Sequence, residues 1–183
     1  IEVFKGMELT SLELRYCREL TGNINALKDI PLTSLNLANT YLQGNIKVFK
    51  GMQIKELNLL GCKQIEGDIE VFRGMELASL NLYYCRELTG NIDSLKDCPL
   101  TSLNLESCYK LEGDIESLKD CPLQVLNLAG NYTNPSKFTG DIEVFKNMEL
   151  TSLELSYCNQ LTGDIEVFKG MPLTSLVLQC LGY

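Results

Sequence analysis

Cysteine is the residue type in this sequence with the widest range of possible chemistry, and the chain has eight cysteines in 183 residues. A thiolate can attack a carbonyl carbon or bind zinc, but nucleophilic catalysis needs a base beside the thiol, and the chain contains no histidine. The same absence excludes a Ser-His-Asp triad and every zinc site that uses histidine. No C-x-x-C pair, phosphate-binding loop or dinucleotide-binding glycine motif occurs. We therefore predict that the chain is not an enzyme and has no catalytic residues, metal or cofactor.

The spacing of the cysteines favours a structural use. Five of them recur at equivalent places along the chain, where a small polar group facing inward could satisfy backbone groups of a loop; they are Cys17, Cys62, Cys85, Cys108 and Cys158. Thr40 and Asn131 fill this place elsewhere, so we expect Asn131 to be buried and its glycosylation motif to be unavailable. Cys98 and Cys121 fall in an apolar column, where a disulfide between them is conceivable. Buried, reduced thiols are favoured, and they predict an intracellular, reducing compartment.

An internal repeat determines the elements that must position these residues. Isoleucine recurs at 1, 24, 46, 69, 92, 115, 142 and 165, mostly at intervals of 23 residues. These isoleucines divide the chain into eight units, which we predict to form one domain over residues 1–183. No unit can bury its apolar face alone, so the units must stack on one another.

Each unit is expected to contain one strand, a bend and a short helical turn. Leu12 and Leu14 alternate with polar residues, which is the period of a half-buried strand. An Asp or Asn precedes each isoleucine after the first, as an N-cap would; these residues are Asn23, Asn45, Asp68, Asn91, Asp114, Asp141 and Asp164. Gly, Asp or Asn follows the basic residue of each turn, at places such as Gly51, Asp29 and Asn147, where Gly and Asn suit a left-handed exit.

The run Leu150-x-x-Leu153-x-Leu155-x-x-Cys158 repeats in phase along the chain. It resembles the leucine-rich repeat family, whose signature is L-x-x-L-x-L-x-x-N/C-x-L. The segment from Leu161 to Ile165 is similar to the plant-type L-x-G-x-I element, whereas the cysteine resembles the cysteine-containing subclass, so the pattern is a hybrid. The resemblance implies an α/β leucine-rich repeat solenoid that is curved, with a parallel sheet on the concave face and short helical turns on the convex face. It also implies protein binding on the concave face.

Three apolar columns are assigned to the core. The first is the isoleucine column, the second runs from Phe4 to Phe168, and the third runs from Met7 to Met171 through Cys98 and Cys121.

The charge of the chain limits its partners. The formal net charge is −8 and the sequence pI is about 4.6, which argues against binding to nucleic acid. No apolar run is long enough to predict a membrane span. A basic column on the helical turns could dock an anionic surface, but we favour pairing with a glutamate three residues earlier, as in Glu70–Arg73 and Glu116–Lys119.

The outward positions of the strands form the candidate binding surface. Two of their columns are monotonous runs of Ser and Asn, which a purely solvated sheet face would also explain. The next two columns vary more and contain tyrosines, which bury a large area at low entropic cost. The residues predicted here to contact a partner are Arg15, Tyr16, Tyr83, Tyr84, Glu106 and Tyr157.

The sixth unit is irregular, because Ile115 and Ile142 are 27 residues apart. Four extra residues must form a loop, and such insertions often serve binding, although a tolerated insertion is the simpler interpretation. Tyr132, Lys137 and Phe138 are added to the predicted contact residues.

The function favoured by these patterns is a protein-protein interaction module. The alternative is a structural subunit of a larger assembly, docked end to end through apolar residues at both termini, such as Val3 and Phe4 at one end and Leu176, Cys180 and Leu181 at the other. The sequence names no partner.

Overall fold

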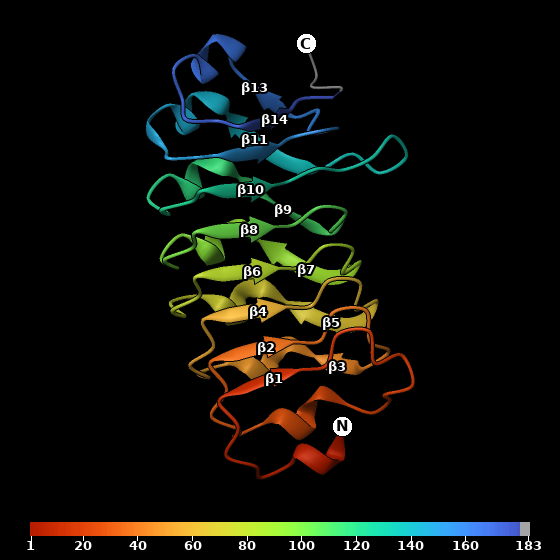
Figure 1. Cartoon of the computed structure of the whole chain (residues 1–183). Coiled ribbons are helices and arrows are strands. Elements are labelled where there is room, and N and C mark those ends of the chain that lie inside the picture. The colour runs from red at the N-terminus through yellow and green to blue at the C-terminus, as the bar shows by residue number, and fades with distance from the viewer. Residues whose placement is uncertain (180–183) are drawn as a thin grey trace.

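The computed structural model describes residues 1–179 as a stack of short strands and helical turns (Figure 1). Leu181 and Cys180, which belong to the predicted apolar end, lie outside the described residues. One strand from each unit joins a parallel sheet of eight strands in the order of the chain. These strands are β1 (Ser11–Glu13), β2 (Ser34–Asn36), β4 (Glu56–Asn58), β6 (Ser79–Asn81), β8 (Ser102–Asn104), β10 (Val125–Asn127), β12 (Ser152–Glu154) and β14 (Ser175–Val177).

The register of this sheet is the same at every step. Leu57 pairs with Leu80, and Leu80 pairs with Leu103, so each central leucine lies beside its counterpart in the next unit. A slip of one residue would turn the leucines outward, and therefore their burial fixes the register. The predicted strand of each unit is confirmed.

A second parallel sheet, which the sequence analysis did not predict, lies behind the first. Its order is β13-β11-β9-β7-β5-β3. The strands are β3 (Gln43–Asn45), β5 (Gln64–Asp68), β7 (Glu87–Asn91), β9 (Leu111–Asp114), β11 (Lys137–Asp141) and β13 (Leu161–Thr162). Each contains or adjoins a glycine with positive φ, such as Gly67 (φ +125°), which lies against the preceding unit where a Cβ atom would meet Asn45 Oδ1 at 2.6 Å. Glycine is uncommon inside strands, so the sequence pattern of these segments does not indicate a strand.

The helical turns are 3₁₀ helices that follow the second sheet. They are η1 (Glu2–Phe4), η2 (Ile24–Leu27), η3 (Ile46–Phe49), η4 (Ile69–Phe72), η5 (Ile92–Leu95), η6 (Ile115–Leu118), η7 (Ile142–Asn147) and η8 (Ile165–Phe168). The seven predicted caps are confirmed, since each Asp or Asn side chain accepts a hydrogen bond from the backbone N–H two residues later. The predicted left-handed exit is confirmed at Gly51 but is wrong at Asn147, which is the last residue of a longer helix. Asp29, for which it was not predicted, also has a left-handed backbone, with φ +68°.

The core fills the space between the eight-stranded sheet and the helical turns. Phe49, Phe72 and Phe145 are fully buried, as are most members of the isoleucine column. The first and last units lack a covering neighbour among the described residues, and there Met7 is 40% exposed and Ile165 is 51% exposed. The three predicted core columns are therefore confirmed in the inner units, except that Met52 is half-buried and packs against the core.

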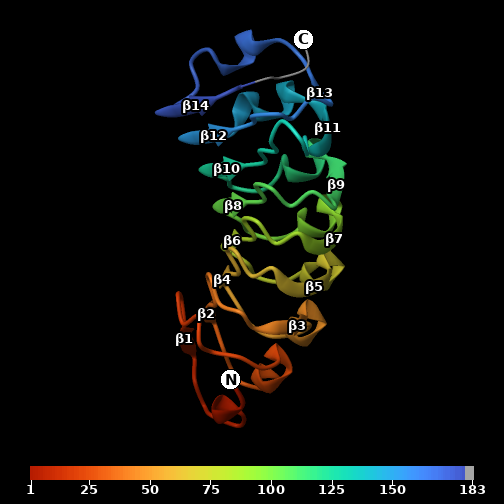
Figure 2. The ribbon, with the colours of Figure 1, turned by 90° about the vertical axis from the view of Figure 1, so that its right-hand side faces the viewer.

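The fold is an α/β solenoid whose open face is gently concave (Figure 2). The second sheet and the helical turns occupy the opposite, convex side. The predicted fold class is confirmed. Within residues 1–179, no helix is long and apolar enough to cross a membrane.

Candidate functional site

Four of the five recurring cysteines, Cys62, Cys85, Cys108 and Cys158, point inward, and each thiol donates to a carbonyl of the preceding unit. Cys85 Sγ lies 2.9 Å from the Leu59 oxygen, and Cys108 Sγ lies 2.9 Å from the Leu82 oxygen. Thr40 instead donates within its own unit, and its hydroxyl lies 2.8 Å from the Leu37 oxygen. Burial raises the pKa of the Cys108 thiol to about 12. These thiols remain protonated at neutral pH, and their role is structural.

No cysteine among residues 1–179 forms a disulfide, and the conceivable Cys98–Cys121 pair remains two thiols. Burial raises the pKa of both to about 11. Cys17, in the first unit, is the exposed exception.

Asn131 does not occupy the cysteine position of the sixth unit, contrary to the prediction. It is half-exposed, and its Oδ1 accepts hydrogen bonds from the backbone N–H groups of Thr133 and Asn134. Its Nδ2 donates to the Tyr109 hydroxyl. Ser136 is buried instead, and its hydroxyl oxygen accepts a hydrogen bond from the Phe138 backbone N–H at 3.5 Å. The inserted residues therefore move the chain's inward-pointing group from Asn131 to Ser136.

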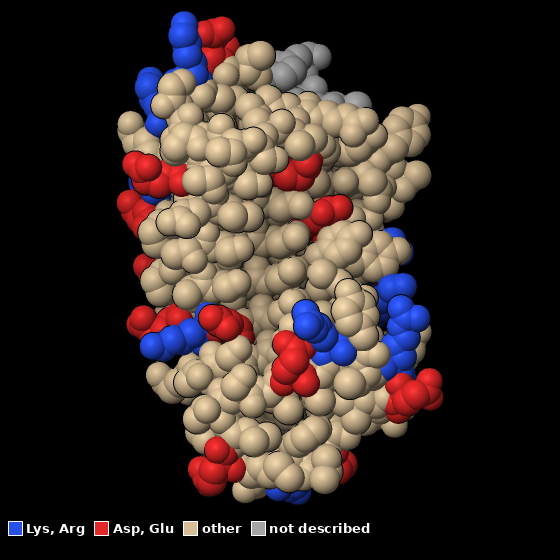
Figure 3. Space-filling model, viewed as in Figure 1, with Lys and Arg blue, Asp and Glu red and all other residues tan. Residues whose placement is uncertain are grey.

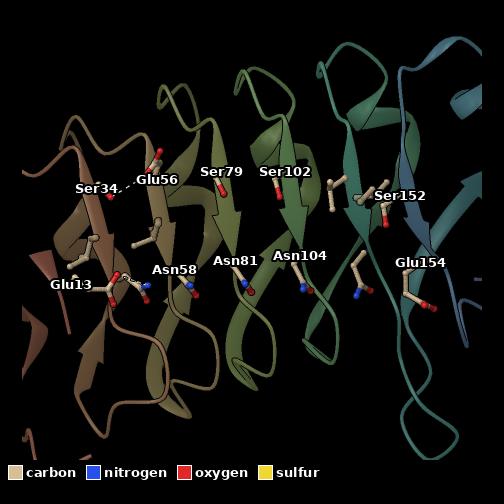
Figure 4. A pocket seen from close by; sticks show the side chains of 16 residues that line it. Glu13, Ser34, Glu56, Asn58, Ser79, Asn81, Ser102, Asn104, Ser152 and Glu154 are labelled. Atoms are coloured by element: carbon tan, nitrogen blue, oxygen red, sulfur yellow. Dashed lines mark hydrogen bonds between the residues drawn. The ribbon is translucent and has the colours of Figure 1, made fainter. Parts of the chain in front are cut away.

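The concave face forms a shallow groove lined by the serine and asparagine columns (Figure 4). The asparagines of β2, β4, β6, β8 and β10 each accept a hydrogen bond from the backbone N–H two residues later, at 3.0 Å. Glu13 and Glu154 do the same in their units. These bonds hold the chain where each strand ends, which explains why the asparagine column is monotonous.

The amide nitrogen, Nδ2, of each asparagine side chain faces the groove. Asn36 Nδ2 donates to Glu13 at 3.0 Å, and Asn127 Nδ2 donates to Glu106 at 2.8 Å. In the middle of the face, the Nδ2 groups of Asn58, Asn81 and Asn104 have no hydrogen-bond acceptor among the described residues. The groove thus offers a row of oriented amide donors.

Three of the predicted tyrosines have a left-handed backbone. The φ angles are +60° at Tyr16, +63° at Tyr84 and +57° at Tyr157, and Gly61 fills the same column with φ +71°. This conformation costs a residue with a side chain about 1 kcal/mol. Tyrosine therefore stands where the backbone alone would favour glycine.

The structure brings only some of the predicted contact residues together. The rings of Tyr83 and Tyr84 are 5.9 Å apart. The pKa of Tyr83 is raised by burial and by the charge of Glu106, which lies in the next unit. Arg15 and Tyr16 lie three strand steps away, at roughly 14 Å, and Tyr157 is equally far on the other side. Tyr132 is 85% exposed on the inserted loop, and Lys137 is also exposed.

Phe138 is wrong as a contact residue, because it is only 2% exposed. It pairs with Gly113 as Leu111 pairs with Gly90, so it fills a core column of leucines and isoleucines. Phe138 stands four residues before Ile142, as Leu111 stands four residues before Ile115. This four-residue spacing before the isoleucine identifies Phe138 as a core residue from the sequence alone.

A row of cations and tyrosines along the strand-exit loops was not predicted as a site. The ammonium of Lys63 lies 5.0 Å from the centre of the Tyr84 ring. The guanidinium of Arg86 lies 3.8 Å from that ring and 5.3 Å from the Tyr109 ring. We call Lys63, Tyr84, Arg86 and Tyr109 the cation–tyrosine ladder. Lys63, Arg86 and Tyr109 each directly follow an inward-pointing cysteine. This shared position is the sequence signal that could have identified them as one column.

The ladder continues toward the first unit. A shallow pocket at the same edge is lined by Arg18, Tyr41 and Lys63. Toward the sixth unit, the Tyr109 hydroxyl bonds with Asn131 and so joins the ladder to the inserted loop. The edge of the concave face is therefore basic and aromatic over five successive units.

Models of protein families gave no match to the chain, and a search of curated protein sequences gave none either. The described residues also contain no cluster of three or more His, Cys, Asp or Glu side chains suited to a metal ion.

Proposed function

We propose that this chain is a non-catalytic protein-binding scaffold of the leucine-rich repeat type. It engages a partner protein through the concave face of the eight-stranded sheet and the tyrosines along its edge. The observation that carries the proposal is the concave face itself, which no element among residues 1–179 covers and whose asparagine amides are already held in one orientation. Side chains fixed before binding lose little entropy on binding, which favours affinity.

The strained tyrosines support the same conclusion. Tyr16 is 62% exposed in a left-handed conformation, so neither burial nor backbone preference accounts for a tyrosine there. Exposed tyrosines are frequent anchors in protein interfaces. The cysteines of residues 1–179, which form no disulfide, further support a reducing compartment as the site of action.

A second candidate function is a structural subunit that docks through its ends. The exposed apolar side chains of the outer units favour it, since Val3 is 69% exposed and Ile165 is 51% exposed. The two functions place the partner on different surfaces, so one experiment can separate them.

The test is cross-linking mass spectrometry on the chain purified with its partner from the native source. A partner on the concave face should cross-link to the lysines of the strand-exit loops, Lys63, Lys110 and Lys137. A partner on the ends should cross-link to Lys5 and Lys169, and this result would replace the first function by the second.

Matched variants make the test specific. Each variant introduces the residue that the second unit has at the equivalent position. Tyr83→Ala corresponds to Ala38, and Tyr157→Asn corresponds to Asn39. Both should lower recovery of the partner at least tenfold, whereas Lys47→Ala on the convex side should not. Equal recovery with all three variants would refute binding through the concave face.

A further inference from the structure

The basic residues of the molecule fall into two groups that differ in their partners. On the convex side, three cations are neutralised by a glutamate three residues earlier, at 2.6 Å for Arg73–Glu70, 2.8 Å for Lys119–Glu116 and 2.6 Å for Lys146–Glu143. This pairing is what the sequence analysis favoured for that column. The other cations of this column, which are Lys5, Lys28, Lys50, Lys96 and Lys169, form no ion pair and no cation–π contact among the described residues.

The strand-exit loops are different. Among residues 1–179, Arg18, Lys63 and Arg86 form no ion pair, and two of them rest on the Tyr84 ring instead. Of the described cations on this edge, Lys110 alone is paired, with Glu87 at 2.6 Å. The tyrosine faces hold the cations in place while leaving their charge uncompensated. In a chain of net charge −8, this edge is a local excess of positive charge, and Figure 3 shows blue side chains gathered at the right-hand edge of the concave face.

We propose that the cation–tyrosine ladder, together with Arg18 and Tyr41, is the docking site for an acidic segment of the partner protein. The inference rests on the proposed function and names the partner chemistry that this edge selects. Carboxylates of the segment would pair with Arg18, Lys63 and Arg86. Its backbone would run along the stack from the first unit toward the inserted loop.

The geometry favours an extended peptide over other polyanions. The cations lie on one narrow edge at steps of the strand spacing, about 4.8 Å. A single acidic strand can follow such an edge, whereas a membrane surface or a nucleic acid would also meet the acidic groups of the flanking surfaces. Glu13, Glu56 and Glu154 line the concave groove and repel a broad anionic ligand.

The structure contains a precedent for carboxylates on this surface. Glu56 accepts a hydrogen bond from Ser34 at 3.0 Å, and Glu13 accepts one from Asn36 at 3.0 Å. The free amides of Asn58, Asn81 and Asn104 offer the same kind of donor next to the ladder. An acidic segment can therefore use both the cations and the amides.

The experiment is an NMR titration of the ¹⁵N-labelled chain with an octapeptide of alternating Glu and Ser. We expect chemical-shift changes concentrated at the amides of Lys63, Tyr84, Arg86 and Tyr109. The affinity should fall severalfold between 50 mM and 300 mM salt, because exposed charges are screened. The matching Gln-Ser peptide should cause no shifts, and neither should the Lys-Ser peptide at these residues.

Two variants locate the interaction. The double variant Lys63→Glu/Arg86→Glu should weaken binding of the Glu-Ser peptide at least tenfold. Its control, Lys28→Glu/Lys50→Glu, changes the net charge equally on the exposed convex side and should retain most of the affinity. Tyr84→Asn, which uses the residue found at the equivalent Asn39, keeps the left-handed backbone but removes the ring, and it should weaken binding severalfold by releasing both cations. Dispersed spectra of each variant establish that it is folded.

Three outcomes would overturn the inference: no shifts with the Glu-Ser peptide, shifts centred on the convex side, or tighter binding of an eight-nucleotide single-stranded DNA. None of them bears on the proposed function, which the cross-links to the native partner decide separately. Conversely, a partner that cross-links only to the ends would refute the proposed function, even if the ladder binds the acidic peptide.

Discussion

The inward-pointing thiols behave as hydrogen-bond donors of the core. Cys85 is fully buried and donates to the Leu59 carbonyl of the preceding unit. We expect Cys85→Ala to lower the free energy of unfolding by about 2 kcal/mol, through the lost bond and the small cavity. Cys85→Ser keeps a hydroxyl donor, like the one that Thr40 supplies in the second unit, and should lose less. Urea unfolding gives the values, and Cys17→Ala, at an exposed site, should change nothing.

The same thiols predict how stability depends on alkaline pH. Burial raises the pKa of Cys98 and Cys121 to about 11 and that of Cys108 and Cys158 to about 12, from an ordinary 9.0. The folded chain therefore keeps these protons where the unfolded chain loses them. Their contribution to stability is complete below pH 9 and is lost as the pH rises through 11 to 12.

Above pH 9, each such thiol should lower the free energy of unfolding by about 1.4 kcal/mol per pH unit until its folded pKa is reached. Urea unfolding of the native chain and of Cys108→Ala between pH 8 and pH 10.5 measures the slope. The variant should show a shallower decline. Equal slopes would mean that Cys108 does not hold its proton more tightly in the folded state.

At the scale of the element, the glycines of the second sheet allow neighbouring units to approach. A Cβ atom on Gly67 would lie 2.6 Å from Asn45 Oδ1, whereas one on Gly51 would meet no atom within 4 Å, although both glycines have positive φ. Gly67→Ala should cost about 3 kcal/mol, from backbone strain together with overpacking. Gly51→Ala should cost about 1 kcal/mol from strain alone. Similar losses in urea unfolding for the two variants would contradict the close approach.

The sequence predicts most of these elements because each unit repeats the same local signals. The caps at Asn23 and its counterparts, the strand leucines and the inner core columns are all visible as fixed spacings. The second sheet is hidden, since its two- to five-residue strands contain polar residues and a glycine of positive φ.

The misplaced residues of the sixth unit have one cause. Asn131 was placed by counting forward from the strand, whereas the insertion lies between the strand and the core column. Counting back from Ile142 places Phe138 correctly in the core. The cation–tyrosine ladder could not be predicted as a contact, because it depends on distances between side chains of neighbouring units.

At the scale of the whole molecule, each unit contacts only its neighbours, and so stability should be graded along the stack. Leu80 is 1% exposed in a central strand, while Leu176 is 39% exposed in the last one. We expect amide hydrogen exchange at least a hundredfold slower in β6 and β8 than in β1 and β14. NMR-detected exchange measures this directly. Uniform protection across the strands would show that the stack unfolds as a single cooperative block.

Because the strand register is uniform, the length of this molecule is set by the number of its units. Excising residues 92–114 would join Asn91 to Ile115, a junction of the same kind as the Asp114–Ile115 junction it replaces. Every remaining leucine would still find its counterpart, and the stack would shorten by one strand spacing, about 4.8 Å. The surface would then accept a ligand shorter by the same step. Under the proposed function, duplication or loss of a unit would therefore change the length of the segment that the concave face can hold by one strand spacing.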